Sequence, residues 1–326
     1  SDVCSSDLIH QRLERKEQTI LFLNRRGYSS ALECPKCGFV AECPNCSISL
    51  TYHRREQKLA CHICGHHAPV PGACPKCQNP AIRYAGLGTE KVEDVLGKLF
   101  PSARVRRMDS DIMKRKEDYR RVLGEFRAGK VDILVGTQMI AKGLHFPNVT
   151  LVGIIYADMA LHLPDFRAGE RTFQLLVQVA GRAGRGEIEG EVIVQSFTPF
   201  HPAIQHARQH DYLGFYDQEI EYRQQLHYPP TSRLVSLTAR SKNEEKAKFS
   251  LTAIARELRK HISATDSLGD PAPAPLAKVQ NHFRYQLMVR GDKILRLTEA
   301  VTKVLAATKL PDDVTLAVDV DPLSLL

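Results

Sequence analysis

The segment "QVAGRAGRG", residues 178–186, places two arginines among glycines directly after an apolar stretch. Gln178, Arg182 and Arg185 have helical spacing, so their side chains project toward one side. The intervening glycines leave room for a bulky ligand, and the planar guanidinium group suits phosphate oxygens. The segment therefore indicates contact with a polyphosphate such as a nucleoside triphosphate. The structural alternative for Arg182 is an ion pair with a carboxylate on a neighbouring helix.

Four Cys-x-x-Cys pairs, "CPKC", "CPNC", "CHIC" and "CPKC", follow one another between residues 34 and 77. Each such turn directs two thiolates at one tetrahedral centre, and two turns complete a closed four-sulfur zinc site without an open position for catalysis. The pairs therefore predict two Zn²⁺ ions per chain. Disulfide bonds are the alternative, which the lack of a visible secretory signal disfavours.

The four cysteine pairs can combine sequentially, interleaved or nested, and the sequence alone leaves all three open. Only the nested choice joins the second and third pairs across a loop close to the usual zinc-ribbon length. We predict the nested arrangement, in which the ligands of one ion are Cys34, Cys37, Cys74 and Cys77 and those of the other are Cys43, Cys46, Cys61 and Cys64.

Composition is that of an ordinary water-soluble globular protein, with 43% hydrophobic and 25% charged residues in a chain of 326. This length suffices for about two domains. No apolar run approaches the roughly 20 residues that a membrane helix requires, so we expect no membrane partner and a cytoplasmic location. The formal net charge of +8 suggests an anionic partner such as nucleic acid. Eight thiolates with two Zn²⁺ ions would lower that charge to about +4, which weakens this argument.

Strands and helices alternate on both sides of the cysteine-rich segment. Strands are predicted at 19–24, 82–86, 104–109, 131–136, 148–157 and 190–197, and helices from Thr89 to Pro101, near 115–128 and near 166–182. Continuously apolar strands that alternate with helices predict an α/β fold with a parallel sheet covered on both faces. We therefore predict one α/β domain, residues 8–32 and 79–227, interrupted by a zinc-binding insertion at 33–78. Residues 1–7 have the composition of stray or linker sequence.

A change of composition near "YPPTSR", residues 228–233, marks the start of another domain, 228–326. Strands are predicted at 234–240, 277–281, 284–290 and 314–320, and helices at 243–262 and 292–308, with a Pro- and Ala-rich loop at 270–278. This β-α-β-β-α-β order is typical of an α+β, ferredoxin-like (split βαβ) domain. The segment "NHFRYQ", residues 281–286, mixes basic and aromatic side chains that suit nucleic acid, although an exposed hairpin edge explains it equally well.

A complete nucleotide site is missing from the sequence. The string "GEFRAGKV", residues 124–131, imitates a phosphate loop, but Val131 replaces the Ser or Thr that would hold magnesium. The string also runs from a helix into a strand, the reverse of the order that directs backbone N–H groups at phosphates. The arginine-rich segment is therefore half of a site, as in a two-lobed helicase motor in which the second lobe supplies arginines across the cleft.

Four segments resemble the primosomal replication-restart DNA helicases, the PriA family: "LFLNRRGYS", "ILVGTQMIAKGLHFPNVTLVGII", "DFRAGERTFQLLVQVAGRAGRG" and the terminal "DVDP". The resemblance runs from about Leu8 to the C-terminus and includes all four cysteine pairs. It implies a second RecA-like helicase lobe with an inserted two-zinc module, followed by the family's C-terminal domain. The first motor lobe, with its P-loop, and the DNA-binding N-terminal region would lie outside this chain.

The resemblance also implies roles for individual residues. Thr137 and Gln138 would contact phosphates of the tracking DNA strand, although capping of the following helix is a structural alternative. Asn24, Arg25 and Arg26 would support the same strand or the cleft edge. Lys142, Gly143 and Gln178 would line the nucleotide cleft. Arg182 and Arg185 would stabilise charge on the γ-phosphate. His145 stands where helicases of this superfamily commonly have Asp, so no carboxylate contact to the ribose is assumed.

The function implied is that of an ATP-dependent 3′–5′ DNA helicase that recognises stalled forks and restarts replication by primosome assembly. ATP and Mg²⁺ would be cofactors of the complete enzyme. Its partners would be forked and single-stranded DNA, the single-stranded-DNA-binding protein and other primosomal proteins. Without a P-loop we expect this chain alone not to hydrolyse ATP. The alternative is a non-catalytic, zinc-stabilised module that binds DNA or protein.

Overall fold

The computed structural model describes residues 2–23, 31–34, 36–53, 57–61, 63–80, 83–85, 88–109, 112–113, 115–140, 146–183 and 189–325. Contacts along the chain separate into two compact units. The first unit comprises residues 1–28, 86–163 and 167–216, and the second comprises 29–85, 164–166 and 217–326. The cysteine-rich module and the C-terminal domain thus group together in the second unit. The domain boundaries given in the sequence analysis, 8–32 with 79–227, 33–78 and 228–326, remain predictions.

The first unit is built on a five-stranded parallel sheet with the strand order β10-β9-β1-β8-β7. The strands are β1 (Gln18–Leu23), β7 (Val105–Met108), β8 (Ile133–Gly136), β9 (Val149–Ile155) and β10 (Glu191–Val194). The central strand β1 is buried at every position, as expected for a strand covered on both faces. The predicted α/β class is confirmed.

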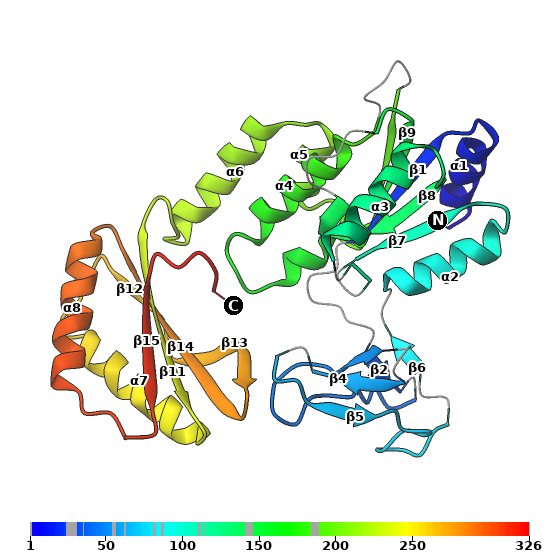
Figure 1. Ribbon diagram of the computed structural model, residues 1–326. Helices are drawn as coiled ribbons and strands as arrows, with labels where there is room; N and C mark the ends of the chain where they lie inside the picture. The colour runs from blue at the N-terminus through cyan, green and yellow to red at the C-terminus, as the bar shows by residue number, and fades with distance from the viewer. Residues whose placement is uncertain are drawn as a thin grey trace. The chain divides into compact units, whose positions relative to one another are not determined.

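Helices cover both faces of this sheet (Figure 1). Ile20 and Phe22 of β1 pack in one core cluster with α3 (Lys116–Arg127), α4 (Ala168–Ala180) and α5 (Pro202–Arg208). Leu21 and Leu23 point the other way, into a cluster with α1 (Asp2–Glu14) and α2 (Thr89–Leu99). This alternation is the period of two that places successive strand side chains on opposite faces. Helix α1 begins at Asp2, so part of the stretch expected to be linker has a helical backbone.

Two helices of this region were not predicted. They are α5 and α6 (Tyr212–Gln225), both between the last strand of the parallel sheet and residue 228. Helix α6 exposes Tyr212, Leu213, Tyr216 and Tyr222. Its apolar residues do not follow one helical stripe, which is the signal on which a helix prediction depends.

The cysteine-rich module forms a small antiparallel sheet with the order β5-β4-β3-β2-β6. Its strands are β2 (Ala31–Glu33), β3 (Thr51–His53), β4 (Lys58–Ala60), β5 (His67–Pro69) and β6 (Arg83–Ala85). The run at 82–86 was expected to resume the α/β pattern, but β6 pairs antiparallel with β2. The periodicity of so short a run does not reveal which sheet it joins.

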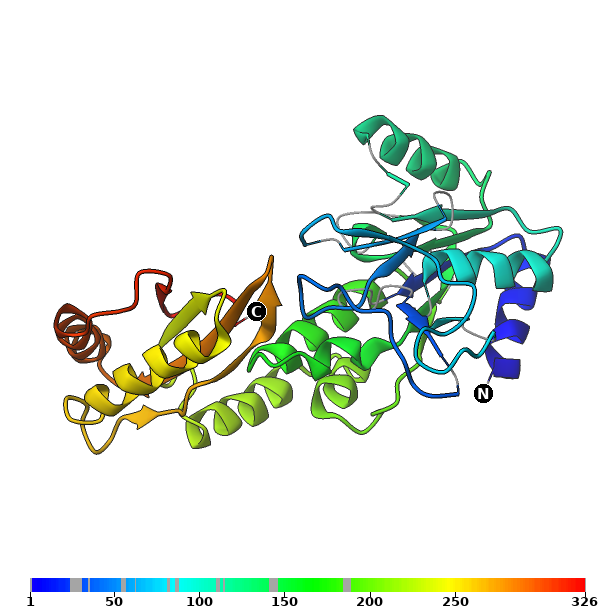
Figure 2. The ribbon, with the colours of Figure 1, turned by 90° about the horizontal axis from the view of Figure 1, so that it is seen from below.

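The C-terminal domain has the predicted β-α-β-β-α-β order. Its main elements are β11 (Arg233–Ser241), α7 (Glu244–Leu258), β13 (Ala272–Val279), β14 (His282–Gly291), α8 (Ile294–Ala307) and β15 (Thr315–Val320), with a short β12 (Ser267–Leu268) before β13. Antiparallel β14, β11 and β15 lie in this order, and β12 and β13 pair with the other edge of β14. Helices α7 and α8 pack against one face of the sheet, and Figure 2 shows α7 running along its strands.

The predicted Pro- and Ala-rich loop at 270–278 was wrong, because most of it is strand β13. Among the described strands, β13 pairs with β14 alone, and the register shifts between Pro273 and Lys278. Proline lacks a backbone N–H group, so it is tolerated on an edge strand and at irregular positions. The three prolines led to a loop prediction, although the pairing of an edge strand can accommodate them.

Candidate functional site

The outer cysteine cluster joins the first and last Cys-x-x-Cys pairs. The Sγ atoms of Cys34 and Cys77 are 3.6 Å apart, as are those of Cys37 and Cys74. All four Sγ atoms lie within 4.8 Å of one another. Cys34 and Cys74 are fully buried. The structure therefore brings these four thiols to a single centre.

The inner cluster joins the second and third pairs. Cys43, Cys46, Cys61 and Cys64 also have Sγ atoms within 4.8 Å of one another, and those of Cys43 and Cys64 are 3.6 Å apart. Cys43, Cys46 and Cys61 form part of the hydrophobic core of the module, together with Leu32 and Leu59. The grouping of the eight cysteines is thus the nested one.

The spacing within both clusters suits a tetrahedral zinc ion. Four sulfurs that each lie about 2.3 Å from Zn²⁺ are about 3.8 Å from one another, close to the separations of the thiols here. A disulfide bond needs about 2.0 Å between sulfurs, so these thiols are not paired in disulfides. Four thiolates fill the coordination sphere, which leaves no open position for a substrate.

Backbone N–H groups prepare some of these thiols for metal binding. The N–H of His66 is the main cause that lowers the pKa of Cys64, to about 7. Burial raises the pKa of Cys34, but the N–H groups of Cys37 and Lys36 outweigh it, so this pKa falls to about 6. Each cluster thus holds one thiol of lowered pKa beside one of raised pKa, since burial and the neighbouring thiols raise the pKa of Cys43 and of Cys77 to about 12. Cysteine binds a metal as the thiolate, so zinc binding would displace these protons.

The second candidate site lies at the carboxyl edge of the parallel sheet, where β1, β8 and β9 end together. Phe22 of β1 is in register with Gly136 at the end of β8 and with Ile154 near the end of β9. Thr137 follows Gly136 directly, and Gln138 opens the 3₁₀ helix η1 (Gln138–Ile140), which contacts β1. Within the part of the chain that the structure describes, the Thr137 hydroxyl makes no hydrogen bond. Its carbonyl accepts one from the N–H of Ile140, at 3.0 Å.

Gly136 has a steric reason to be glycine. A Cβ atom at this position would lie 2.5 Å from the carbonyl oxygen of Met108 on β7 and 3.2 Å from two side-chain atoms of Ile140. The missing side chain lets β7, β8 and η1 approach one another closely. Gly136 therefore fixes the point at which Thr137 leaves the sheet.

Two residues at the same edge were missed by sequence reasoning, Tyr156 and Asp158. Tyr156 has a left-handed φ of +53° and stacks on Phe197, with 5.4 Å between the ring centroids. The Phe197 side chain is 75% exposed. Nothing in the sequence near "YADMA" distinguishes these residues from an ordinary strand end, because their partners lie about 40 positions later in the chain.

Asp158 is fully buried in the 3₁₀ helix η2 (Ala157–His162) and anchors the loop after β10. Its Oδ2 accepts hydrogen bonds from the N–H groups of Phe197 and Thr198, at 2.7 and 2.8 Å, and from the hydroxyls of Ser196 and Thr198, at 2.9 and 3.0 Å. Burial alone would raise the pKa of Asp158, but these hydrogen bonds outweigh it and hold the pKa below its ordinary value. The carboxylate therefore stays ionised while it binds the loop.

Helix α4 carries the other described candidates. It contacts both η2 and β9, and it buries Thr172, Phe173, Leu176 and Val179 against the sheet. Gln178 lies on its exposed side. Arg182 is half-buried just after the helix, where its N–H donates to the carbonyl of Val179 at 3.0 Å.

Several predicted site residues lie outside the described residues: Asn24, Arg25, Arg26, Lys142, Gly143 and Arg185, and also His145. The Gln138 backbone is described but its side chain is not. Of the string that imitates a phosphate loop, Gly124 lies in α3, Gly129 has a φ of +68°, and the N–H of Lys130 donates to the carbonyl of Glu125. The string thus closes a helix and leads into β8, an order unlike that of a phosphate loop.

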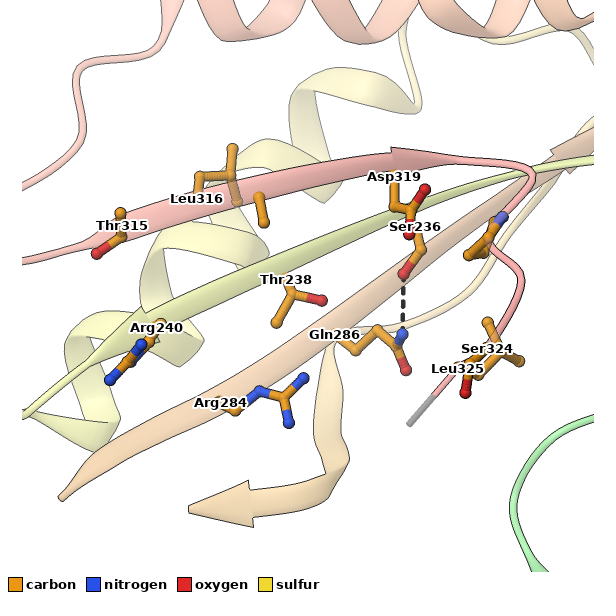
Figure 3. Close-up of a pocket in the computed structure, with 12 residues that line it drawn as sticks. Ser236, Thr238, Arg240, Arg284, Gln286, Thr315, Leu316, Asp319, Ser324 and Leu325 are labelled. Atoms are coloured by element: carbon orange, nitrogen blue, oxygen red, sulfur yellow. Dashed lines mark hydrogen bonds between the residues drawn. The ribbon is translucent and has the colours of Figure 1, made fainter. Parts of the chain in front are cut away.

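A third candidate site is a hollow of about 380 Å³ on the face of the C-terminal sheet opposite α7 and α8. Figure 3 shows Arg240 of β11 and Arg284 of β14 on neighbouring strands at one end, and Asp319 further along. The amide of Gln286 donates to the hydroxyl of Ser236 at 2.8 Å. No carboxylate pairs with Arg240 or Arg284 among the residues that the structure describes. The arginine end can therefore accept an anion.

Three family models match successive parts of the chain. The "Helicase conserved C-terminal domain" matches residues 85–187, the "PriA DNA helicase Cys-rich region (CRR) domain" matches 43–69, and the "Primosomal protein N C-terminal domain" matches 224–323. No helix among the described residues combines the length and the apolar character that crossing a membrane needs.

Curated relatives are similar over nearly the whole chain. Replication restart protein PriA of Bacillus subtilis (strain 168) is 46% identical over 319 residues, which cover 96% of this chain and 39% of that protein. Replication restart protein PriA of Synechocystis sp. is 41% identical over 315 residues, with 95% of this chain and 38% of that protein covered. The chain therefore spans about two fifths of these relatives' length. The solved C-terminal domain of the DEAD-box protein Dbp5 is 16% identical, covers 64% of this chain and 78% of that one, and has a TM-score of only 0.31.

Proposed function

Because this chain belongs to the PriA family of replication restart proteins and matches their C-terminal portion, we propose that it supplies the second RecA-like lobe of an ATP-dependent 3′–5′ DNA helicase. The complete enzyme would act in the cytoplasm, where it recognises stalled forks and restarts replication by primosome assembly. Its partners would be forked and single-stranded DNA, the single-stranded-DNA-binding protein and other primosomal proteins. ATP and Mg²⁺ would be bound mainly by the other motor lobe.

The observation that carries this proposal is the convergence of β1, β8 and β9 at one edge of the parallel sheet, with Thr137 just beyond it. A hydroxyl without a hydrogen bond to a described residue, at the end of a rigid strand, suits contact with a DNA phosphate. Gln138 follows on η1, and Asn24, Arg25 and Arg26 follow β1 in the sequence. These residues would hold the backbone of the tracking strand.

The nucleotide would meet this lobe through the α4 segment. Arg182 and Arg185 would stabilise negative charge on the γ-phosphate, while Gln178, Lys142 and Gly143 line the cleft. Arg182 follows directly after a helix that buries five residues, so the packing of this helix holds the Arg182 backbone in place before a ligand arrives. This preorganisation is what charge stabilisation in a transition state requires.

We further propose that each cysteine cluster binds one Zn²⁺ ion with a structural role. The donor sets fit, since four thiolates per centre lie at tetrahedral separations and most of their sulfurs are buried. Zinc would hold the small β sheet together, because this module has only a few buried apolar side chains of its own.

A second candidate function is a non-catalytic module that binds DNA or protein through the C-terminal domain. The arginine end of the hollow in Figure 3 favours it, because Arg240 and Arg284 lie together at that end, whereas the carboxylate of Asp319 lies further along the hollow. No aromatic side chain lines this hollow, so an anionic backbone rather than a stacked base is the ligand that fits. The two functions are compatible in one enzyme.

The first experiment measures zinc content and ATP hydrolysis on one sample of the purified chain, with and without single-stranded DNA. We expect two zinc ions and no hydrolysis, and DNA-stimulated hydrolysis when the family's complete protein is assayed. Hydrolysis by the 326-residue chain alone would contradict the proposal.

A second experiment tests the sheet edge. In the complete protein, Thr137→Val should weaken DNA stimulation of hydrolysis, because it removes a hydroxyl and keeps the shape of the side chain. Thr137→Ser, which retains the hydroxyl, is the matched control and should preserve the stimulation. Equal activity of both variants would mean that Thr137 has no contact with DNA.

A further inference from the structure

Each Cys-x-x-Cys pair lies in a short turn, here called a knuckle. Three of the four knuckles are closed by the same internal backbone hydrogen bond. The residue after the second cysteine is Gly38, Gly65 or Gln78, and each has a positive φ, between +56° and +74°. Each donates its N–H to the carbonyl of the first cysteine of its knuckle, at 2.8 to 3.0 Å. The knuckle at Cys43 and Cys46 is the exception.

In that knuckle the corresponding residue is Ser47, which has no positive φ. The Ser47 N–H instead donates to the carbonyl of Lys278, at 2.8 Å. Lys278 belongs to β13 of the C-terminal domain, so a backbone group of the knuckle is satisfied by a partner more than 200 residues away in the sequence. Both partners lie within the second compact unit.

The sulfur of the second cysteine also has a donor from the C-terminal domain in place of a local N–H group. In two other knuckles the N–H two residues further on, that of His66 or Asn79, is close enough to the Sγ of Cys64 or Cys77 to lower the pKa of that thiol by itself. Two residues beyond Cys46, the N–H of Ile48 instead donates to the Cys46 carbonyl, at 2.9 Å.

The donor to the Cys46 Sγ is the N–H of Gln280, at 3.3 Å. Gln280 lies in the turn between β13 and β14. The C-terminal domain thus takes the place that a local N–H group occupies elsewhere in the module.

The turn is shaped for this contact. Val279 and His282 are paired, and the two residues between them, Gln280 and Asn281, have φ values of +48° and +61°. A two-residue turn with two positive φ values is of the tight type that joins antiparallel strands. The N–H groups of its two central residues point away from the strand ladder, so they are available as donors.

Two more hydrogen bonds strengthen the junction. The N–H of Asn281 donates to the carbonyl of Asn45 at 2.8 Å, and the ammonium group of Lys278 donates to the carbonyl of Pro44 at 3.0 Å. In Figure 1 the β13–β14 hairpin, drawn in orange, reaches the cysteine-rich module, drawn in blue. Residues 44–47 and 278–281 are therefore joined by four hydrogen bonds, of which one ends on a cysteine sulfur.

We propose that the β13–β14 turn of the C-terminal domain belongs to the inner zinc site, because it donates a hydrogen bond to one of the sulfurs that bind the metal. A zinc ion with four thiolates carries two net negative charges, and N–H donors to the sulfurs offset that charge. Zinc binding by the inner cluster and docking of the turn therefore stabilise each other, and by linkage each raises the affinity of the other equally. Among the described residues, no group of the C-terminal domain donates a hydrogen bond to a sulfur of the outer cluster, so we expect no such dependence there. This inference depends on metal binding and not on helicase activity.

The direct test replaces zinc by ¹¹³Cd in the ¹⁵N-labelled chain and records amide correlations with the metal. A hydrogen bond from N–H to a metal-bound sulfur transmits a coupling from the amide proton to cadmium. We expect the Gln280 amide to couple to one of two cadmium ions. The Asn45 amide, which lies 3.4 Å from the Cys43 Sγ, is the internal control on the same ion. A coupling at Asn45 without one at Gln280 would overturn the proposal.

A pair of variants tests the linkage. Gln280→Val with Asn281→Val disfavours the positive φ values, whereas Gln280→Gly with Asn281→Gly keeps them accessible and retains both N–H groups. We expect the valine variant to lose one of its two zinc ions to a chelator about tenfold faster or more, the effect typical of removing an outer partner of a metal ligand. The glycine variant should release both ions at the original rates. The linkage would be contradicted if the valine variant released zinc at the original rate, or if it released both ions equally faster. The cadmium spectrum of the unaltered chain shows in either case whether the Gln280 N–H contacts the Cys46 sulfur.

Discussion

Arg240 and Arg284 lie directly opposite each other on the antiparallel strands β11 and β14. Burial lowers the pKa of Arg284 and the charge of Arg240 lowers it further, so the two guanidinium groups repel one another. Like charges in direct cross-strand register destabilise a sheet. An anion bound between them would relieve this repulsion, which makes the pair a candidate contact for the DNA backbone.

Arg284→Gln should therefore weaken binding of single-stranded DNA and reduce the salt dependence of binding by about one phosphate contact. It should leave the melting temperature unchanged or raise it, because it removes a like-charge pair. Arg256→Gln is the matched control, since Arg256 is an exposed residue of α7 on the covered side of the sheet. Titrations at several salt concentrations measure both quantities. Equal losses of affinity in the two variants would show that only total charge matters.

Asp158→Asn should destabilise the first unit by about 2 kcal/mol or more at pH 7, because hydrogen bonds to a buried charged group are worth about 1.5 to 3 kcal/mol. The folded pKa of Asp158 is depressed, so its contribution is fully present above the unfolded value of about 3.9 and is lost as the pH falls below that value. Denaturant unfolding at pH 7 and near pH 3 should therefore show a smaller difference between the two proteins at the lower pH. A difference that grows on acidification would contradict this account.

Gly136→Ala should destabilise the parallel sheet by about 1 to 3 kcal/mol, the usual range for overpacking. The added methyl group would lie 2.5 Å from the Met108 carbonyl, and neither strand can move without disturbing the core. Gly97→Ala in α2 is the control, because no atom lies within 4 Å of its added Cβ and alanine favours a helix. Thermal unfolding of the two variants should shift in opposite directions.

The sequence predicted those features that depend on side-chain patterns. Buried runs such as "TILFL" predicted the parallel strands, and repeated cysteine pairs predicted a metal-binding module. The strand at 272–279 was not predicted as a whole because it is rich in proline. The role of Asp158 was not predicted because its hydrogen-bond partners lie about 40 residues later in the chain. The contact between Ser47 and Lys278 was not predicted either, because a backbone hydrogen bond does not depend on the types of the two residues.

Cys43→Ser should lower the zinc content from two ions to one while the outer cluster keeps its metal. The two clusters share no ligand, and Cys43 belongs only to the inner one. Metal analysis after gel filtration measures the stoichiometry. In the complete protein we expect ATP hydrolysis to persist in this variant, because the clusters have no open coordination position for a substrate. Loss of hydrolysis together with retained DNA unwinding would contradict this division of roles.

Arg185→Ala in the complete protein should lower the rate of ATP hydrolysis by about 10³-fold or more, the effect attributed to arginine fingers, with DNA affinity nearly unchanged. A guanidinium group that acts only on the developing charge of the γ-phosphate contributes to the transition state and little to binding of the ground state. The control is Arg121→Ala, because Arg121 is an exposed residue of α3 that pairs with Asp118 on the same helix. Single-turnover hydrolysis and DNA titration of both variants separate the two effects. A loss of DNA affinity as large as the loss of rate would mean that Arg185 binds the DNA strand instead of the nucleotide.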